Sequence, residues 1–136
     1  MSHTIRFNEG LGVIVLRAKQ QINAIEIVSA LEEILLIPDF KPGLSLVVDL
    51  RGGDIRLTAD EVRIIANAAK FAEDRWGDTK CAILASNNDS YGLGRMFMSL
   101  TDQHQLESHV FRTALEADGW LGLGVEMVDI LERTPE

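Results

Sequence analysis

Short runs of β-branched and other apolar residues alternate along this chain with longer segments whose apolar side chains recur every three or four positions. The short runs have the period of strands, and the longer segments have the period of amphipathic helices. Such alternation predicts an α/β protein in which helices pack on a mixed sheet. A chain of 136 residues fits one domain, residues 1–136, because domains commonly run to roughly 100–150 residues.

The first third of the chain predicts a hairpin followed by a helix. Residues 3–8 and 13–16 have strand character and are separated by turn glycines, so we expect them to pair in antiparallel fashion. We expect a helix to begin after Asn23, whose side chain can accept from a free backbone N–H while Glu26 reaches back. Residues 44–50 predict a buried strand.

A second helix is defined most sharply by its ends. Thr58-Ala59-Asp60-Glu61 has the capping-box pattern, and an apolar stripe follows it as far as Trp76. Gly77 is placed to terminate this helix.

The remaining elements continue the alternation. We expect a central strand at 81–85, a helix at about 90–104, a short strand at 110–111, a helix beginning after Thr113 and one further short helix at 125–132. Without that last helix, the order is ββαβαβαβα, and right-handed crossovers would leave the later strands largely parallel.

The composition narrows the class of protein. A formal charge of −8 disfavours binding to nucleic acid or to an anionic membrane surface. The apolar stretches are short and interrupted by charge, and the first residues do not resemble a signal peptide, so neither membrane insertion nor secretion is expected. With its single cysteine, the chain reads as a cytoplasmic protein.

Several local motifs, taken in order, resemble those of one known family. They are Val48-Asp49-Leu50-Arg51, Thr58-Ala59-Asp60-Glu61, Tyr91-Gly92-Leu93-Gly94-Arg95-Met96, Val110-Phe111-Arg112 and the later pairs Glu116-Ala117 and Trp120-Leu121. Together with the order of elements they resemble STAS domains, and more closely the SpoIIAA-like group of uncharacterised bacterial proteins, over about residues 3–122. The resemblance implies a SpoIIAA-like (STAS-type) mixed sheet of about five strands with helices packed on it.

Thr58 is a candidate for two roles. The resemblance aligns it with the phosphorylated serine of anti-sigma factor antagonists, where the motif is Asp-Ser-x-Gly. Here the local sequence is Leu57-Thr58-Ala59-Asp60, so both the acidic residue before the hydroxyl and the glycine after it are missing. An N-cap hydroxyl is the simpler interpretation, although phosphate at a helix N-terminus would also meet free N–H groups.

Two other groups of residues are candidates for binding. Tyr91, Arg95 and Met98 share one face of the 90–104 helix, and such residue types are enriched at interface cores, so this face could join a homodimer or hold a ligand; the alternative is ordinary core packing. Arg51, Gly52 and Gly53 follow a strand end, where α/β sheets bind ligands, but paired glycines are also common in turns.

No catalytic or metal-binding set is visible. Cys81 lies in an expected interior strand with no histidine beside it, and His3, His104 and His109 show no ligand spacing. We therefore expect no cofactor, no metal and no enzymatic activity. The resemblance favours a regulatory or protein-interaction module that self-associates, with its protein partner unknown. The alternative is a small carrier of a lipid or other apolar molecule beneath the 90–104 helix, because STAS-like folds resemble the Sec14-type carrier fold and Met96, Phe97 and Met98 could line a pocket.

Overall fold

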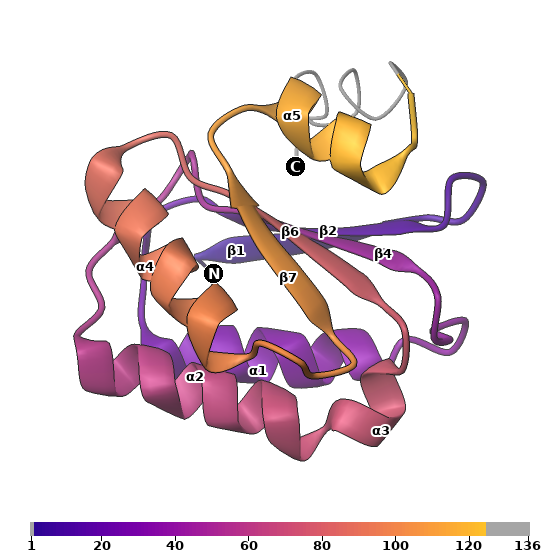
Figure 1. The fold of residues 1–136 in the computed structure, drawn as a ribbon, viewed down its shortest axis with the longest axis horizontal. Coiled ribbons are helices and arrows are strands. Elements are labelled where there is room, and N and C mark those ends of the chain that lie inside the picture. The colour runs from indigo at the N-terminus through magenta and orange to yellow at the C-terminus, as the bar shows by residue number, and fades with distance from the viewer. Residues whose placement is uncertain (1, 125–136) are drawn as a thin grey trace.

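Five strands form one mixed sheet in the computed structural model, which describes residues 2–124 (Figure 1). The strands are β1 His3–Asn8, β2 Val13–Ala18, β4 Ser45–Asp49, β6 Lys80–Leu84 and β7 Glu107–Phe111. They lie in the order β1-β2-β4-β6-β7, with β1 antiparallel to β2 and every later pairing parallel. This arrangement confirms the expected fold class, the hairpin and the parallel later strands.

The helices cover both faces of the sheet. They are α1 Ala24–Leu35, α2 Ala59–Phe71, α3 Glu73–Trp76, α4 Asn88–Leu100 and α5 Ala114–Leu121. The first, second and fourth helices pack on one face, and α5 packs on the other, as Figure 1 shows. The predicted helix at 125–132 lies outside the described residues.

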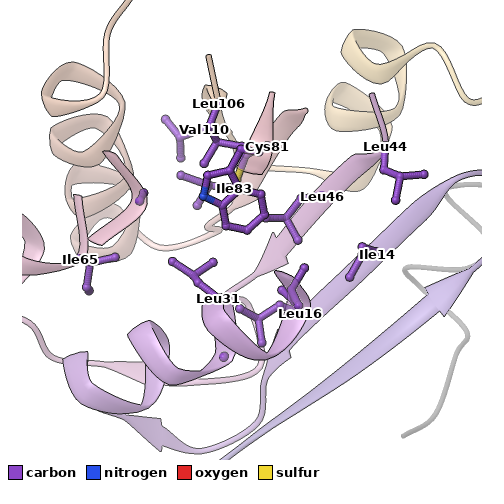
Figure 2. Packing of buried hydrophobic residues seen from close by; sticks show 14 of the residues in the cluster. Ile14, Leu16, Leu31, Leu44, Leu46, Ile65, Cys81, Ile83, Leu106 and Val110 are labelled. Atoms are coloured by element: carbon purple, nitrogen blue, oxygen red, sulfur yellow. The ribbon is translucent and has the colours of Figure 1, made fainter. Parts of the chain in front are cut away.

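The larger of two main cores lies between the sheet and the layer formed by α1, α2 and α4. Alternate residues of the strands supply it, among them Leu16, Leu46 and Ile83, and the helices add residues such as Leu31 and Ile65 (Figure 2). Because strand side chains alternate between faces, the neighbouring residues Val15, Val47 and Leu84 build a smaller core beneath α5.

A small second sheet was not predicted. Strand β3, Gln21–Ile22, pairs in parallel with β5, Asp54–Ile55, and neither segment was expected to be a strand. Two residues are too few to give a periodic signal, and their pairing depends on a contact between segments about thirty residues apart in the chain. This second sheet fixes the residues that lead into α2.

The helix expected to run to Trp76 is instead interrupted. Residue Ala72 leaves helical geometry at φ −98° and ψ 18°, so α2 ends at Phe71 and the four-residue α3 follows. Gly77 ends α3 as expected, with a φ of +57°. Trp76 is fully buried after this break, and its ring meets that of Phe40 edge to face at 5.7 Å between centroids.

The cap of α1 is half as expected. The side chain of Asn23 accepts from the backbone N–H of Glu26 at 2.8 Å. Glu26 does not reach back to Asn23, and that part of the prediction is wrong. Its carboxylate instead accepts from the ring of His3 at 2.5 Å and from the backbone N–H of Ser2 at 3.1 Å. The hydrogen bond from His3 is the main reason why the pKa of Glu26 lies below its ordinary value.

Candidate binding site

A groove of about 910 Å³ lies between the segment that leads into α2 and the first turn of α4. Residues 54–58 form one wall, and residues 87–90 with Leu93 form the other. These walls follow β4 and β6, which are neighbouring parallel strands, so the groove lies beyond the carboxyl ends of the sheet. Ligands of open α/β sheets bind at such positions.

Two helix N-termini meet the groove, each closed by its own cap. Thr58 is the N-cap of α2: its hydroxyl accepts from the N–H of Glu61 at 3.1 Å, and its own N–H donates to the Glu61 carboxylate at 2.8 Å. Asn87 caps α4 by accepting from the N–H of Ser90 at 2.8 Å. The expected capping box at Thr58 is therefore present.

The charged groups of the groove are mostly acidic. Asp54 and Asp89 face it together with one cation, Arg56, whose guanidinium already pairs with Asp54 at 3.0 Å. Asp89 has no ion-pair partner among residues 2–124. Within the capping box the Glu61 carboxylate lies beside Thr58, so a phosphate on that hydroxyl would have to displace a negative charge.

An apolar cavity of about 70 Å³ lies beneath α4, next to the groove. The cavity and the groove share Ile55, Leu57 and Leu93, which form the mouth between them. All sixteen residues that line the cavity are apolar, Cys81 and Gly94 included. An apolar lining of this kind favours apolar groups over polar ones.

Helix α4 buries few of its side chains, which is unusual for a helix that covers a core. Only Ser90 and Gly94 of this helix are buried, and its large apolar side chains are all partly exposed. The backbone of α4 lies close to the sheet at Gly94, where an added Cβ would lie 2.7 Å from Val110 Cγ2. The cavity lies beside this contact, and Leu93, Gly94 and Phe97 of α4 line it.

The space beside the two glycines of the loop at residues 51–53, which we expected to admit a ligand, is occupied by other residues of the protein. A Cβ on Gly53 would lie 2.8 Å from Ala18 Cβ, and one on Gly52 would lie 3.1 Å from the Ala18 carbonyl oxygen. Arg51 holds the buried Asp49 with two bonds of 2.9 and 3.0 Å, and Arg17 approaches the same carboxylate at 3.3 Å. The glycines therefore have a packing role, and the three loop residues do not line the groove.

The three residues predicted to form a binding face on the 90–104 helix differ in their burial. Tyr91 is half-buried, with the guanidinium of Arg112 above its ring at 4.1 Å. Met98 is half-buried against the larger core, and Arg95 is exposed. Of Met96, Phe97 and Met98, expected to line a pocket, only Phe97 lines the cavity.

The thiol of Cys81 points into the larger core and is buried (Figure 2). Burial raises the pKa of this thiol to about 12. Among residues 2–124 no three His, Cys, Asp or Glu side chains gather where they could hold a metal ion. None of the described helices is both long and apolar enough to cross a bilayer.

Sequence reasoning did not find the groove. Its two walls are some thirty residues apart in the chain, and only the adjacency of β4 and β6 brings them together. One signal was present: Thr58 and Asn87 are both cap residues that follow the ends of buried strands. Read together with the sheet order, that repetition predicts two helix N-termini at the same edge.

Comparison with known proteins supports the fold. The structure is similar to that of an uncharacterized protein from the DUF3478 family with a SpoIIAA-like fold, from Shewanella loihica PV-4. The two align with a TM-score of 0.56 and 14% identity over 88% of this chain and 91% of the other. No family model matches the sequence, and no curated protein matches it. The likeness shows the expected SpoIIAA-like fold and extends to the fold alone.

Proposed function

We propose that this protein is a non-enzymatic, regulatory protein-interaction module that binds its partner in the groove between the N-termini of α2 and α4. One observation carries the proposal: a polar groove of about 910 Å³ shares three apolar residues with an apolar cavity beside it. Polar walls around an apolar centre are the usual anatomy of a protein interface. The resemblance to STAS domains agrees with this class of function.

The size of the cavity favours a protein partner over a lipid. Pockets that hold small-molecule ligands have volumes of roughly 300–1,000 Å³. The cavity of about 70 Å³ is several times smaller, and it has room for one short apolar group. A protein partner can supply such a group as a single side chain and place its remaining contacts in the groove.

A carrier of a small apolar molecule is the second candidate, because the cavity lies beneath α4 as that function requires. A lipid would need α4 to move away from the sheet, and the partly exposed apolar side chains of this helix would permit such a movement. Native mass spectrometry of protein purified gently from its own host tests this candidate. Retained apolar ligand on a monomer would favour the carrier over the interaction module.

Photo-crosslinking in the host tests the leading proposal. A photoreactive amino acid replaces Asn88, an exposed residue of the groove, or Glu32, an exposed residue of α1 that does not line it. The groove position should give a discrete adduct with another protein that the control position does not give. Equal adducts from both positions, or none from Asn88, would contradict the proposal.

Two further expectations belong to the same proposal. A second copy of the chain could meet the exposed Arg95 on α4, and Arg95→Glu would then reduce the mass in solution from dimer to monomer. Thr58 lies on the wall of the groove, so its phosphorylation would add charge to the binding surface. An intact mass higher by one phosphate group, mapped to Thr58, would support that regulation.

A further inference from the structure

We infer that the groove receives a peptide segment of the partner, with one branched aliphatic side chain inserted into the cavity and a basic residue beside it. The inference rests on the proposed function and deepens it, because it specifies the chemistry of the partner. Three observations carry it: the volume of the cavity, the residues of its mouth and the charge of the groove.

The volume selects the anchor. An engineered apolar cavity of about 150 Å³ accepts benzene. A cavity of about 70 Å³ is too small for an aromatic ring and has room for the three or four carbons of a valine, leucine or isoleucine side chain. Because the lining is entirely apolar, a polar anchor would lose its hydrogen bonds with water and gain none.

The mouth fixes where the anchor enters. Ile55 is buried, whereas Leu57 and Leu93 are only half-buried, and all three line both the groove and the cavity. An anchor that passes between them removes its own apolar surface and part of theirs from water. Burial of an aliphatic side chain of this size corresponds to roughly a 10- to 100-fold gain in affinity.

The charge selects the neighbour of the anchor. Asp89 lies on the α4 wall without an ion-pair partner among the described residues, and the only cation on either wall is committed to Asp54. The chain as a whole carries a formal charge of −8. A lysine or arginine next to the anchor would pair with Asp89, whereas an acidic residue would be repelled.

Selection from a display library of random linear 12-residue peptides, panned against the full chain, tests the inference. We expect the selected peptides to share a valine, leucine or isoleucine next to a lysine or arginine. Replacement of that aliphatic residue by alanine in the peptide should weaken binding roughly 10- to 100-fold. Replacement of the basic residue should weaken it by about 2- to 5-fold, as expected for an exposed ion pair.

Matched variants of the protein locate the binding. Leu93→Trp should close the mouth and abolish peptide binding, whereas Leu115→Trp, at an exposed position of α5 on the other side of the sheet, should leave it unchanged. Asp89→Asn should weaken binding by about 2- to 5-fold, and Asp102→Asn, an exposed residue beyond the other end of α4, should not. Should Leu93→Trp fail to fold, Val62→Ile narrows the cavity from α2 instead.

The outcomes separate this inference from the function on which it rests. Peptides that bind the groove through aromatic or acidic residues, or that tolerate Leu93→Trp, overturn the inference and leave the interaction module standing. A selection that yields no peptide, or only peptides that bind outside the groove, also overturns it. In that case the crosslinking from Asn88 decides separately whether a folded partner uses the groove.

Discussion

Two glycines two positions apart in α4 should respond in opposite ways to the same substitution. Alanine is the better helix former by about 1 kcal/mol at an interior position. A Cβ on Gly92 would find no atom within 4 Å, so Gly92→Ala should raise the free energy of unfolding by nearly the whole of that amount. A Cβ on Gly94 would lie 2.7 Å from Val110 Cγ2, 3.1 Å from Val110 Cβ and 3.5 Å from Ile83 Cγ2.

Something must therefore move to accommodate an alanine at position 94. The obstructing side chain is a β-branched valine in a strand, which has little rotamer freedom, so α4 itself has to shift away from β7. Overpacking of this kind costs about 1–3 kcal/mol. After the gain in helix propensity is included, Gly94→Ala should lower the free energy of unfolding by between about 0 and 2 kcal/mol.

Urea unfolding of the two variants and of the unchanged protein measures both effects. The two midpoints should move in opposite directions at an unchanged denaturant dependence. Because both variants carry the same substitution in the same helix, the difference between them isolates the contact with Val110. A Gly94→Ala variant as stable as Gly92→Ala would refute the close packing of α4 against Val110 at position 94.

Four other predictions test separate parts of the structure. Thr58→Ala should lower the free energy of unfolding by about 1 kcal/mol and Thr58→Ser should restore most of it in urea unfolding, because the hydroxyl caps α2. The lowered pKa of Glu26 gives stability that is complete above its ordinary value of 4.5 and is lost as the pH falls through the lower, folded value. The free energy of unfolding, measured from pH 6 to pH 3, should therefore decrease more steeply for the unchanged protein than for Glu26→Gln. Val62→Ile places one more carbon against the cavity and should raise the unfolding free energy by up to about 0.8 kcal/mol, measured in the same way. The Cys81 thiol, with its pKa raised to about 12, should not react with iodoacetamide at pH 8 in the folded protein and should react when the protein is unfolded in urea, as read by intact mass.

The features of this fold that depend on residues close together in the chain could be predicted from the sequence. The caps at Asn23, Thr58 and Thr113 use side chains within three residues of the N–H groups that they serve, and all three are present. The prediction for Glu26 failed for the opposite reason. Its carboxylate is held by His3, a residue more than twenty positions away, and no local pattern indicates that contact.

Thr58, a candidate from the sequence, lies on the wall of the groove, whereas the candidate loop at residues 51–53 ends just before it. The rule that α/β sheets bind ligands beyond their carboxyl ends directed attention to Arg51, Gly52 and Gly53, and the groove begins at Asp54. The glycines are close to Ala18 and to the segment that forms the second small sheet. Sequence alone could not distinguish a loop that approaches a ligand from one that approaches its own chain, because both require the same absence of a side chain.

The residues of α4 determine how closely this helix packs on the sheet. The same packing connects the stability of the protein to its proposed binding site. Gly94 brings the helix backbone close to β7, and Leu93 and Phe97 on either side of it line the cavity rather than filling it. We therefore expect the volume of the cavity to depend on how closely Gly94 approaches Val110. Gly94→Ala, which moves the helix outward, should weaken the fit of a short aliphatic anchor and admit a bulkier one, whereas Gly92→Ala should leave the choice of anchor unchanged. Peptide selections that returned the same anchor for both variants would show that the position of α4 does not control the volume of the cavity. That result would contradict the inference that the cavity volume selects the anchor.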